Sequence, residues 1–182
     1  VTGMGIYNAL FSLQKALFLH PQPTQIWVVG IGGASDPSFQ LSDVYQIIED
    51  TFADVGVWRG THFVSLNTLE LQMEMPVLDS PEWFILSQFQ VELAKKSKGI
   101  TVSSSSGNVE RADHLRLRYN SFIESMEGAS YAYVCHQLKI PVCQIRAISN
   151  YIGDFPRSAW CIDEAIFNLN QILESKISKY LR

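Results

Sequence analysis

Residues 122–149 show the pattern of a strand, a helix and a second strand, and this unit constrains the fold more than any other stretch of the chain. We predict a strand from Phe122 to Ser125, a helix from Gly128 to Leu138 and a strand from Val142 to Ser149. A strand, a helix and a second strand in this order are typical of an α/β sheet. The unit therefore predicts an α/β fold.

Two polar side chains stand at the strand ends of this unit, where α/β sheets bind ligands. Glu127 follows the first strand and Asn150 follows the second, so we expect them to face one site. Glu127 also starts the helix, where free N–H groups and the helix dipole favour a carboxylate. An ionised carboxylate there can accept the two hydroxyls of a ribose. A first-turn acid that only supports its helix gives the same pattern, and position alone does not separate the two interpretations.

The first part of the chain contributes more elements of the same fold. Residues Ile6 to Phe18 have the apolar period of a helix that covers a sheet face. The continuous apolar run Ile26 to Val29 predicts a strand buried on both faces. The glycine-rich stretch Gly30 to Ala34 predicts a tight turn, or a loop in which backbone N–H groups approach a ligand. A further strand is expected from Val44 to Glu49.

The middle of the chain is less regular. We expect an exposed turn at Glu49 to Asp54 and an edge strand or a mobile arm at Thr61 to Pro81. A helix is predicted from Trp83 to Lys96, and its C-terminal dipole would explain the lysines around its end. A strand at Gly99 to Val102 and a connecting loop at Ser103 to Asn108 follow.

Two more helices complete the pattern, a short one at Glu110 to Tyr119 and a last one with an apolar stripe from Ile162 to Ile177. The order of elements predicts one domain, residues 1–182, with a mixed central sheet between helices in three α/β/α layers. The opening residues V-T-G-M-G have the pattern of a strand end and its turn. We therefore expect a strand segment upstream of Val1.

Composition excludes several classes of function. The net charge is −4 and the basic residues are scattered, so nucleic acid is not an expected partner. No apolar run reaches the ~20 residues of a membrane helix, and the cytoplasm is the expected location. The three cysteines have no CxxC spacing, and the four histidines show no ligand spacing. We expect neither a metal nor a cofactor.

Two motifs carry a resemblance to a known family. The segment M-E-G-A-x-x-A-x-V-C at 126–135 and the strand end R-A-I-S-N at 146–150 resemble the nucleosidases of the purine nucleoside phosphorylase superfamily. Within it, the similarity is greatest to the futalosine hydrolases, relatives of the methylthioadenosine/S-adenosylhomocysteine nucleosidases. The resemblance implies the three-layer fold, a homodimer and cleavage of an N-ribosidic bond without cofactor or metal.

The resemblance also assigns roles to individual residues. It implies that Met126 lies under the ribose and that Glu127 binds the ribose hydroxyls. It implies a ribose pocket lined by the stretch 30–34, and a segment matching the family's G-D-x-V motif in which Ser42 replaces the glycine. The remaining implied substrate-binding residues are Met4, Ile31, Gly32, Asn108, Ser149 and Trp160.

Asn150 stands where the adenine-specific relatives have an aspartate that protonates the purine. An asparagine cannot act as a general acid, but its NH₂ can donate to O6 of a 6-oxopurine while its carbonyl accepts N7–H. Adenine has a donor at position 6, so this pairing favours a hypoxanthine-like base. An asparagine that only caps a turn is the structural alternative for Asn150.

These residues together predict a nucleosidase that hydrolyses a 6-oxopurine nucleoside, with futalosine in menaquinone biosynthesis as the expected substrate. A methylthioadenosine/S-adenosylhomocysteine nucleosidase and an inactive nucleoside-binding homologue are the alternatives. The resemblance places the water-activating carboxylate upstream of Val1. Either an upstream segment supplies that group or the protein does not hydrolyse its ligand. Phosphorolysis is less expected, because no convergent set of arginine and serine residues for a phosphate is seen.

Overall fold

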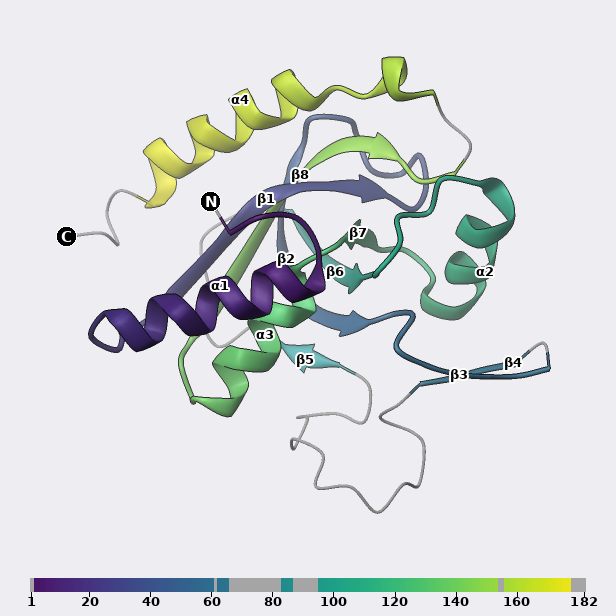
Figure 1. Cartoon of the computed structure of the whole chain (residues 1–182). Helices are drawn as coiled ribbons and strands as arrows, with labels where there is room; N and C mark the ends of the chain where they lie inside the picture. The colour runs from purple at the N-terminus through teal and green to yellow at the C-terminus, as the bar shows by residue number, and fades with distance from the viewer. Residues whose placement is uncertain (1, 61, 66–82, 87–94, 154–155, 178–182) are drawn as a thin grey trace.

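The computed structural model describes residues 2–60, 62–65, 83–86, 95–153 and 156–177. These residues form four α-helices, a short 3₁₀ helix, a π-helical turn and eight strands (Figure 1). In chain order they are α1 (Ile6–Leu19), β1 (Ile26–Ala34), β2 (Val44–Phe52), β3 (Gly56–Arg59), β4 (His62–Ser65), β5 (Phe84–Ile85), β6 (Lys96–Thr101), α2 (Val109–Tyr119), β7 (Ile123–Ser125), α3 (Gly128–Gln137), β8 (Val142–Tyr151), the 3₁₀ helix Arg157–Ala159, α4 (Ile162–Ile172) and the π-helical turn Leu173–Ile177.

Six strands form one mixed sheet in the order β5-β2-β6-β7-β1-β8, and β2 also pairs with β8. The pairs β1–β8, β2–β6 and β6–β7 are parallel, whereas β1–β7, β2–β5 and β2–β8 are antiparallel. The second partner of β8 closes the sheet on itself, so β8 has a neighbouring strand along both edges. A separate antiparallel hairpin is formed by β3 and β4.

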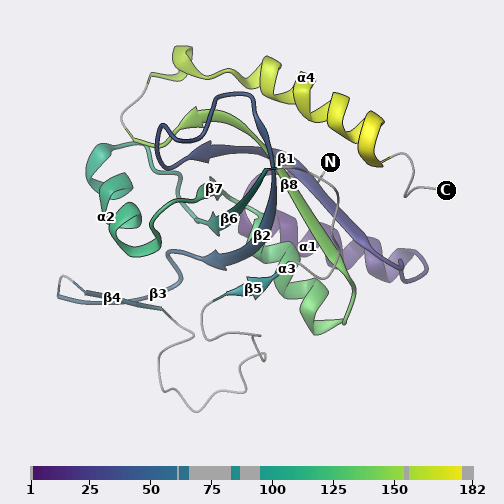
Figure 2. The same ribbon diagram turned by 180° about the vertical axis from the view of Figure 1, so that it is seen from behind.

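Helices cover the sheet on opposite sides. The helices α1 and α3 lie side by side on one side, and α4 crosses the other side over β1 and β8, as Figures 1 and 2 show from opposite directions. The helix α2 lies near the ends of β6 and β7 (Figure 1). The fold is the predicted α/β architecture with a mixed central sheet.

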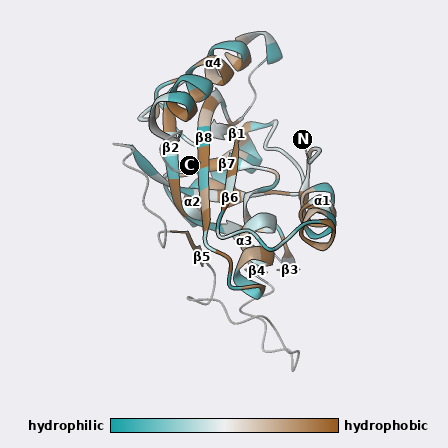
Figure 3. Ribbon diagram, turned by 90° about the vertical axis from the view of Figure 1, so that its left-hand side faces the viewer, coloured by the Kyte–Doolittle hydropathy of each residue, from teal (hydrophilic) through white to brown (hydrophobic). Residues whose placement is uncertain are grey.

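The strand β8 is buried on both sides, and its two sides differ in chemistry. Cys143, Ile145 and Ala147 pack with Ala165 and Leu169 of α4. Val142 and Ile148 instead join the core formed with α1 and α3, and the two residues between them on that side are polar. Figure 3 shows brown and teal bands on β8, and α4 in both colours, as expected for a helix with one buried side.

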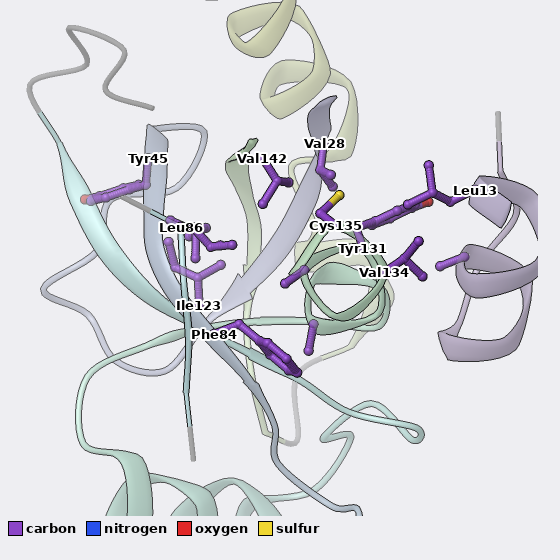
Figure 4. Packing of buried hydrophobic residues seen from close by; sticks show 14 of the residues in the cluster. Leu13, Val28, Tyr45, Phe84, Leu86, Ile123, Tyr131, Val134, Cys135 and Val142 are labelled. Carbon is purple, nitrogen blue, oxygen red and sulfur yellow. The ribbon is translucent and has the colours of Figure 1, made fainter. Parts of the chain in front are cut away.

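The core beneath α3 is closely packed. Tyr131, Val134 and Cys135 of α3 lie between Val28 of β1 and Leu13 of α1 (Figure 4). Small residues make this approach possible, because Ala129 and Ala132 are also completely buried in the same cluster. The strand, helix and strand from which the sequence prediction started therefore form the centre of the molecule.

Several element predictions are confirmed within a few residues, including those for α1, α2, α3, α4, β6, β7 and β8. The predicted tight turn at Gly30–Ala34 is wrong, because these residues continue β1 and pair with β8. Glycines are needed there for packing: a Cβ at Gly30 would lie 2.5 Å from Arg146 Nη1, and one at Gly32 would lie 2.8 Å from the Glu124 carbonyl oxygen.

Two other predictions in the middle of the chain are wrong. Residues 49–52 continue β2 instead of forming an exposed turn, and Asp50 is completely buried. The described residues of 83–96 include β5 and the start of β6, and none of them is helical. The lysines there pair across strands, since Lys98 contacts Glu49 at 2.6 Å. Of the predicted edge strand or arm at 61–81, only 62–65 lie within the described residues, as β4.

Ser42 adopts a backbone conformation that suits glycine. Its φ is +65°, in the left-handed region, and the residue is almost fully buried. Its N–H donates to the Ile148 carbonyl oxygen at 2.8 Å, and its own carbonyl oxygen accepts from Asn168. Its Oγ has no hydrogen-bond partner among the described residues. The glycine of the family motif thus has a clear physical reason at this position.

We expect the Ser42→Gly substitution to stabilise the fold by about 1 kcal/mol, because relief of left-handed strain exceeds the entropy that glycine adds to the unfolded chain. Urea unfolding measures the change. The Ser42→Ala variant is the control, because it removes the hydroxyl but keeps the strain. Equal stability of the glycine and alanine variants would contradict the strain argument.

Candidate active site

Glu127 lies at the start of α3 and is held by contacts from two other parts of the chain. Its Oε1 accepts a hydrogen bond from the Gly5 N–H at 3.0 Å, and its Oε2 lies 3.5 Å from Arg146 Nη1. Gly5 has a φ of +93°, which lets the turn before α1 direct its N–H toward the carboxylate. Thr2, in the same turn, bonds Tyr131 of α3. These contacts give Glu127 a defined position without a cap bond to its own helix.

Arg146 is the partner that sequence analysis missed. Its side chain is 5% exposed, and its Nη1 also donates to the Ile31 carbonyl oxygen at 3.3 Å. Its Nε and Nη2 have no hydrogen-bond partner within the described part of the chain. The signal was present in the sequence, because Gln144 and Arg146 are polar residues at alternate positions of an otherwise apolar strand. Such a period indicates a polar stripe inside the fold.

A second buried carboxylate belongs to the same polar stripe. Asp50 accepts hydrogen bonds from Gln144 Nε2 and Thr101 Oγ1, each at 3.0 Å. Burial raises the pKa of Asp50 to about 6, although the bond from Gln144 and the charge of Arg146 act in the opposite direction. At neutral pH the carboxyl group is therefore ionised inside the protein.

This pKa gives stability an unusual dependence on pH. The folded protein holds the Asp50 proton more tightly than the unfolded chain, so Asp50's contribution to stability falls as pH rises from near 3.8 to about 6. We expect the unfolding free energy of the wild type, measured relative to Asp50→Asn, to fall by on the order of 3 kcal/mol across this window. Urea unfolding at several pH values tests this. A constant difference between the two proteins would contradict it.

Asn150 is the second-last residue of β8 and does not lie beyond the strand, since β8 extends to Tyr151. Its Oδ1 accepts from Ser149 Oγ at 2.7 Å, and its Nδ2 donates to the Tyr151 carbonyl oxygen at 3.0 Å. Ser149 Oγ also lies 3.2 Å from the Gly32 carbonyl oxygen. A Cβ on Gly33 would lie 3.2 Å from Asn150 Nδ2, so the absence of a side chain leaves room for the amide.

The strand β1 connects the surroundings of Glu127 with those of Asn150. The Ile31 carbonyl oxygen binds Arg146, the Gly32 carbonyl oxygen binds Ser149, and Gly33 pairs with Asn150. Two residues of a strand span about 7 Å. The predicted residues Ile31 and Gly32 therefore connect the partner of Glu127 with the neighbour of Asn150 along one strand.

The loop 103–108 is fixed at the same end of the sheet by Glu124. This buried carboxylate accepts from the Ser106 N–H at 2.9 Å and from the hydroxyls of Ser105 and Ser106. Burial raises the pKa of the Glu124 carboxyl, and the bonds from Ser106 oppose that shift. The Ser106 carbonyl oxygen accepts from Gly153 N, which connects the loop to the segment after β8.

The other predicted site residues occupy different surroundings. Asn108 caps α2, because its Oδ1 accepts from the Arg111 N–H at 2.8 Å. Met126 is partly buried and packs against the cluster around α2, and Met4 is 73% exposed beside Gly5. Trp160 is half-exposed next to Cys161, whose N–H bonds the Ser149 carbonyl oxygen.

No group of three or more His, Cys, Asp or Glu side chains is placed to hold a metal ion in the part of the chain that the structure describes. The helices within the described ranges are all too short or too polar to cross a bilayer. All three cysteines are free, and burial raises the pKa of Cys135 and Cys143 to about 12. The polar groups available for chemistry are thus carboxylates, one arginine, hydroxyls and an amide.

The family model described as "Phosphorylase superfamily" matches residues 1–178. The chain belongs to this superfamily. Among curated relatives, the futalosine hydrolase of Streptomyces coelicolor is 28% identical over 138 residues, which cover 75% of this chain and 58% of that protein. The futalosine hydrolase of Thermus thermophilus is 27% identical over 176 residues, which cover 91% of this chain and 74% of that protein.

Solved structures show the same superfamily fold. The futalosine hydrolase of Helicobacter pylori has a TM-score of 0.75 at 16% identity, covering 98% of this chain and 77% of that one. A 5′-methylthioadenosine/S-adenosylhomocysteine nucleosidase from Helicobacter pylori has a TM-score of 0.77 at 14% identity, covering 98% and 78%. At such identities the likeness establishes the fold of this superfamily member, and the choice of ligand depends on its own side chains.

Proposed function

We propose that this protein is a nucleosidase that hydrolyses the N-ribosidic bond of a 6-oxopurine nucleoside of the futalosine type. The observation that carries the proposal is the position of Glu127, which Gly5 and Arg146 hold at the start of α3. Relatives named futalosine hydrolase, and one from Campylobacter jejuni named aminodeoxyfutalosine nucleosidase at 24% identity, support the same reaction class. Release of hypoxanthine would place the reaction in menaquinone biosynthesis.

Glu127 has the capacity to bind a ribose as well as its protein partners. Each of its carboxylate oxygens accepts one hydrogen bond in the structure, and each has a second lone pair. Those lone pairs accept the 2′ and 3′ hydroxyls of the sugar. As the bond to the base breaks, positive charge develops on the sugar, and the nearby carboxylate stabilises it. The buried side chain of Arg146 contacts this carboxylate at 3.5 Å and holds it in position for this role.

Asn150 selects the base in this proposal. Its Nδ2 has one proton beyond the bond to Tyr151, and its Oδ1 has a lone pair beyond the bond from Ser149. The free proton is directed to O6 and the free lone pair to N7–H of a 6-oxopurine. The Tyr151 carbonyl oxygen can only accept, so its bond from Nδ2 fixes which end of the amide is the donor, and this orientation opposes adenine.

The test is a product assay with the full-length protein. We expect hypoxanthine to be released from futalosine, both with and without phosphate, and little base to be released from inosine or methylthioadenosine. Chromatography of the free base measures each reaction. Release of adenine from methylthioadenosine would support the methylthioadenosine/S-adenosylhomocysteine nucleosidase instead, and nucleoside binding without release would indicate a binding protein.

We expect Glu127→Gln to reduce turnover by about a hundredfold or more, because the neutral amide cannot stabilise the developing charge. Steady-state kinetics measure the loss, and circular dichroism checks the fold. Glu110→Gln is the matched control, since Glu110 is an exposed acid in the first turn of α2. Near-normal turnover of the Glu127 variant would remove this residue from the site.

We expect Asn150→Asp to shift the ratio of kcat/KM for adenine over hypoxanthine nucleosides upward by at least about tenfold, because the donor to O6 is lost and an acid is gained. Competition assays with paired nucleosides measure the ratio. The control is Asn120→Asp, at the exposed end of α2. An unchanged ratio would contradict the proposal that Asn150 selects the base.

We also propose that two copies of the chain associate through α1. Tyr7, Phe11 and Phe18 follow one side of this helix, Met4 directly precedes its N-cap, and all four are 69–88% exposed. The stripe begins beside Gly5, which binds Glu127, so a second copy seated on it would lie next to the site. Sedimentation of the wild type and Phe11→Glu tests this, with a dimer and a monomer expected respectively. The three free cysteines suit the reducing cytoplasm, where we place the reaction.

A further inference from the structure

Asp50 is buried next to the first turn of α3, and no role in the chemistry above uses it. A register shift between Ile47 and Glu49 in β2 places Ile47 and Asp50 on the same side of Gly99, although they are three residues apart. A Cβ on Gly99 would meet Ile47 at 2.8 Å and Asp50 at 2.9 Å. Such irregularities in strands frequently re-aim a side chain near an active site.

The hydrogen bonds around Asp50 have a defined direction. The N–H of Ala129 in α3 donates to Thr101 Oγ1 at 2.7 Å. A backbone N–H can only donate, so the hydroxyl of Thr101 accepts this bond and directs its own proton to Asp50 Oδ1, 3.0 Å away. Gln144 Nε2 donates to Oδ2. Two donors therefore converge on the two oxygens of one carboxylate, an arrangement that suits its ionised form.

The first turn of α3 lies directly on this carboxylate. A Cβ on Gly128 would be 2.0 Å from Asp50 Oδ2 and 2.4 Å from Gln144 Nε2, so only glycine fits there. Gly128 directly follows Glu127 in the chain. The ionised carboxylate also lies at the positive end of the helix dipole. Any movement of this contact displaces the backbone that holds Glu127.

Asp50, Arg146 and Glu127 follow one another with alternating charge. From β8, Arg146 acts on Asp50 through its charge and contacts Glu127 at 3.5 Å. From β6 the facing polar group is the hydroxyl of Thr101, and from α3 it is the start of the helix. Arg146 thus interacts with two carboxylates, one on each side of the first turn of α3.

We propose that Asp50 is a positioning residue for the nucleosidase reaction: its ionised carboxylate holds the first turn of α3 through Thr101 and balances the charge of Arg146, and thereby fixes Glu127 for binding the ribose. This inference rests on the proposed role of Glu127. The geometry that supports this role is the chain of hydrogen bonds from Ala129 through Thr101 to Asp50.

The first test is the pH profile of the Asp50→Asn variant in the full-length protein. An asparagine keeps the shape, and rotation of the Gln144 amide restores both hydrogen bonds without the charge. We expect kcat/KM at neutral pH to fall by about tenfold to a hundredfold, because Arg146, whose charge Asp50 no longer balances, shifts its contact with Glu127. The wild type should lose activity as pH falls through about 6, and the variant should lack that step.

The control for this test is Glu49→Gln, which removes one acid from the same strand. The Glu49 side chain contacts Lys98 and does not contact α3. It should retain the activity and the pH profile of the wild type. A purely structural role for Asp50 predicts lower stability with an unchanged pH profile. An Asp50→Asn variant with wild-type kcat/KM and an unchanged acid step would overturn the proposal.

The second test is independent of turnover. Thr101→Val breaks the connection between Asp50 and α3, and we expect the Ala129 amide to exchange its hydrogen about tenfold faster or more. Wild-type exchange at Ala129 in this variant would also overturn the proposal. If the wild type releases no base from any nucleoside, the proposed function fails, and amide exchange still decides whether the hydroxyl of Thr101, which links Asp50 to α3, holds the helix start.

Discussion

The ion pair between Arg146 and Glu127 is the interaction on which the arrangement of this protein depends. An arginine on an inner strand must have its charge compensated, because a buried and unpaired charge is strongly destabilising. The compensation comes from Glu127 at the start of α3 and from the field of Asp50 on β2. The position of α3 on the sheet is therefore fixed by charge as well as by apolar packing.

This requirement explains residues that have no chemistry of their own. Gly30 has no side chain because Arg146 Nη1 would occupy the place of its Cβ, and Gly128 has none because Asp50 lies there. Each glycine thus leaves space for a charged group inside the protein. Substitution at either position would force the charged group to move, and the defined position of Glu127 would be lost.

The groups proposed to bind the sugar and the base lie beside different residues of β1. The Ile31 carbonyl oxygen faces Arg146, near the group proposed to bind the sugar, whereas Gly32 and Gly33 lie beside Ser149 and Asn150, proposed to bind the base. One extended strand therefore connects the group proposed to bind the sugar with the group proposed to bind the base. In this proposal, the side chains next to the strand determine which base is accepted.

Much of the fold could be predicted from local patterns, because a helix stripe or a buried apolar strand is a property of neighbouring residues. The unit 122–149 was predicted correctly for this reason. The stretch 30–34 was misinterpreted because glycine favours turns locally, whereas here its role is to make room for Arg146. Asp50 was placed in an exposed turn because its neighbours are acidic and polar, and nothing nearby in sequence shows its partners on β6 and β8.

The sequence by itself therefore determined the α/β class, the central unit and the pair Glu127 and Asn150 as candidates. Only the tertiary structure decided that Arg146 and Asp50 accompany Glu127, since these residues come from strands far apart in the chain and meet only when β2 and β8 pair. Electrostatic compensation inside a protein is a property of distances in space. In the sequence, such compensation is visible at most as a polar residue within an apolar strand.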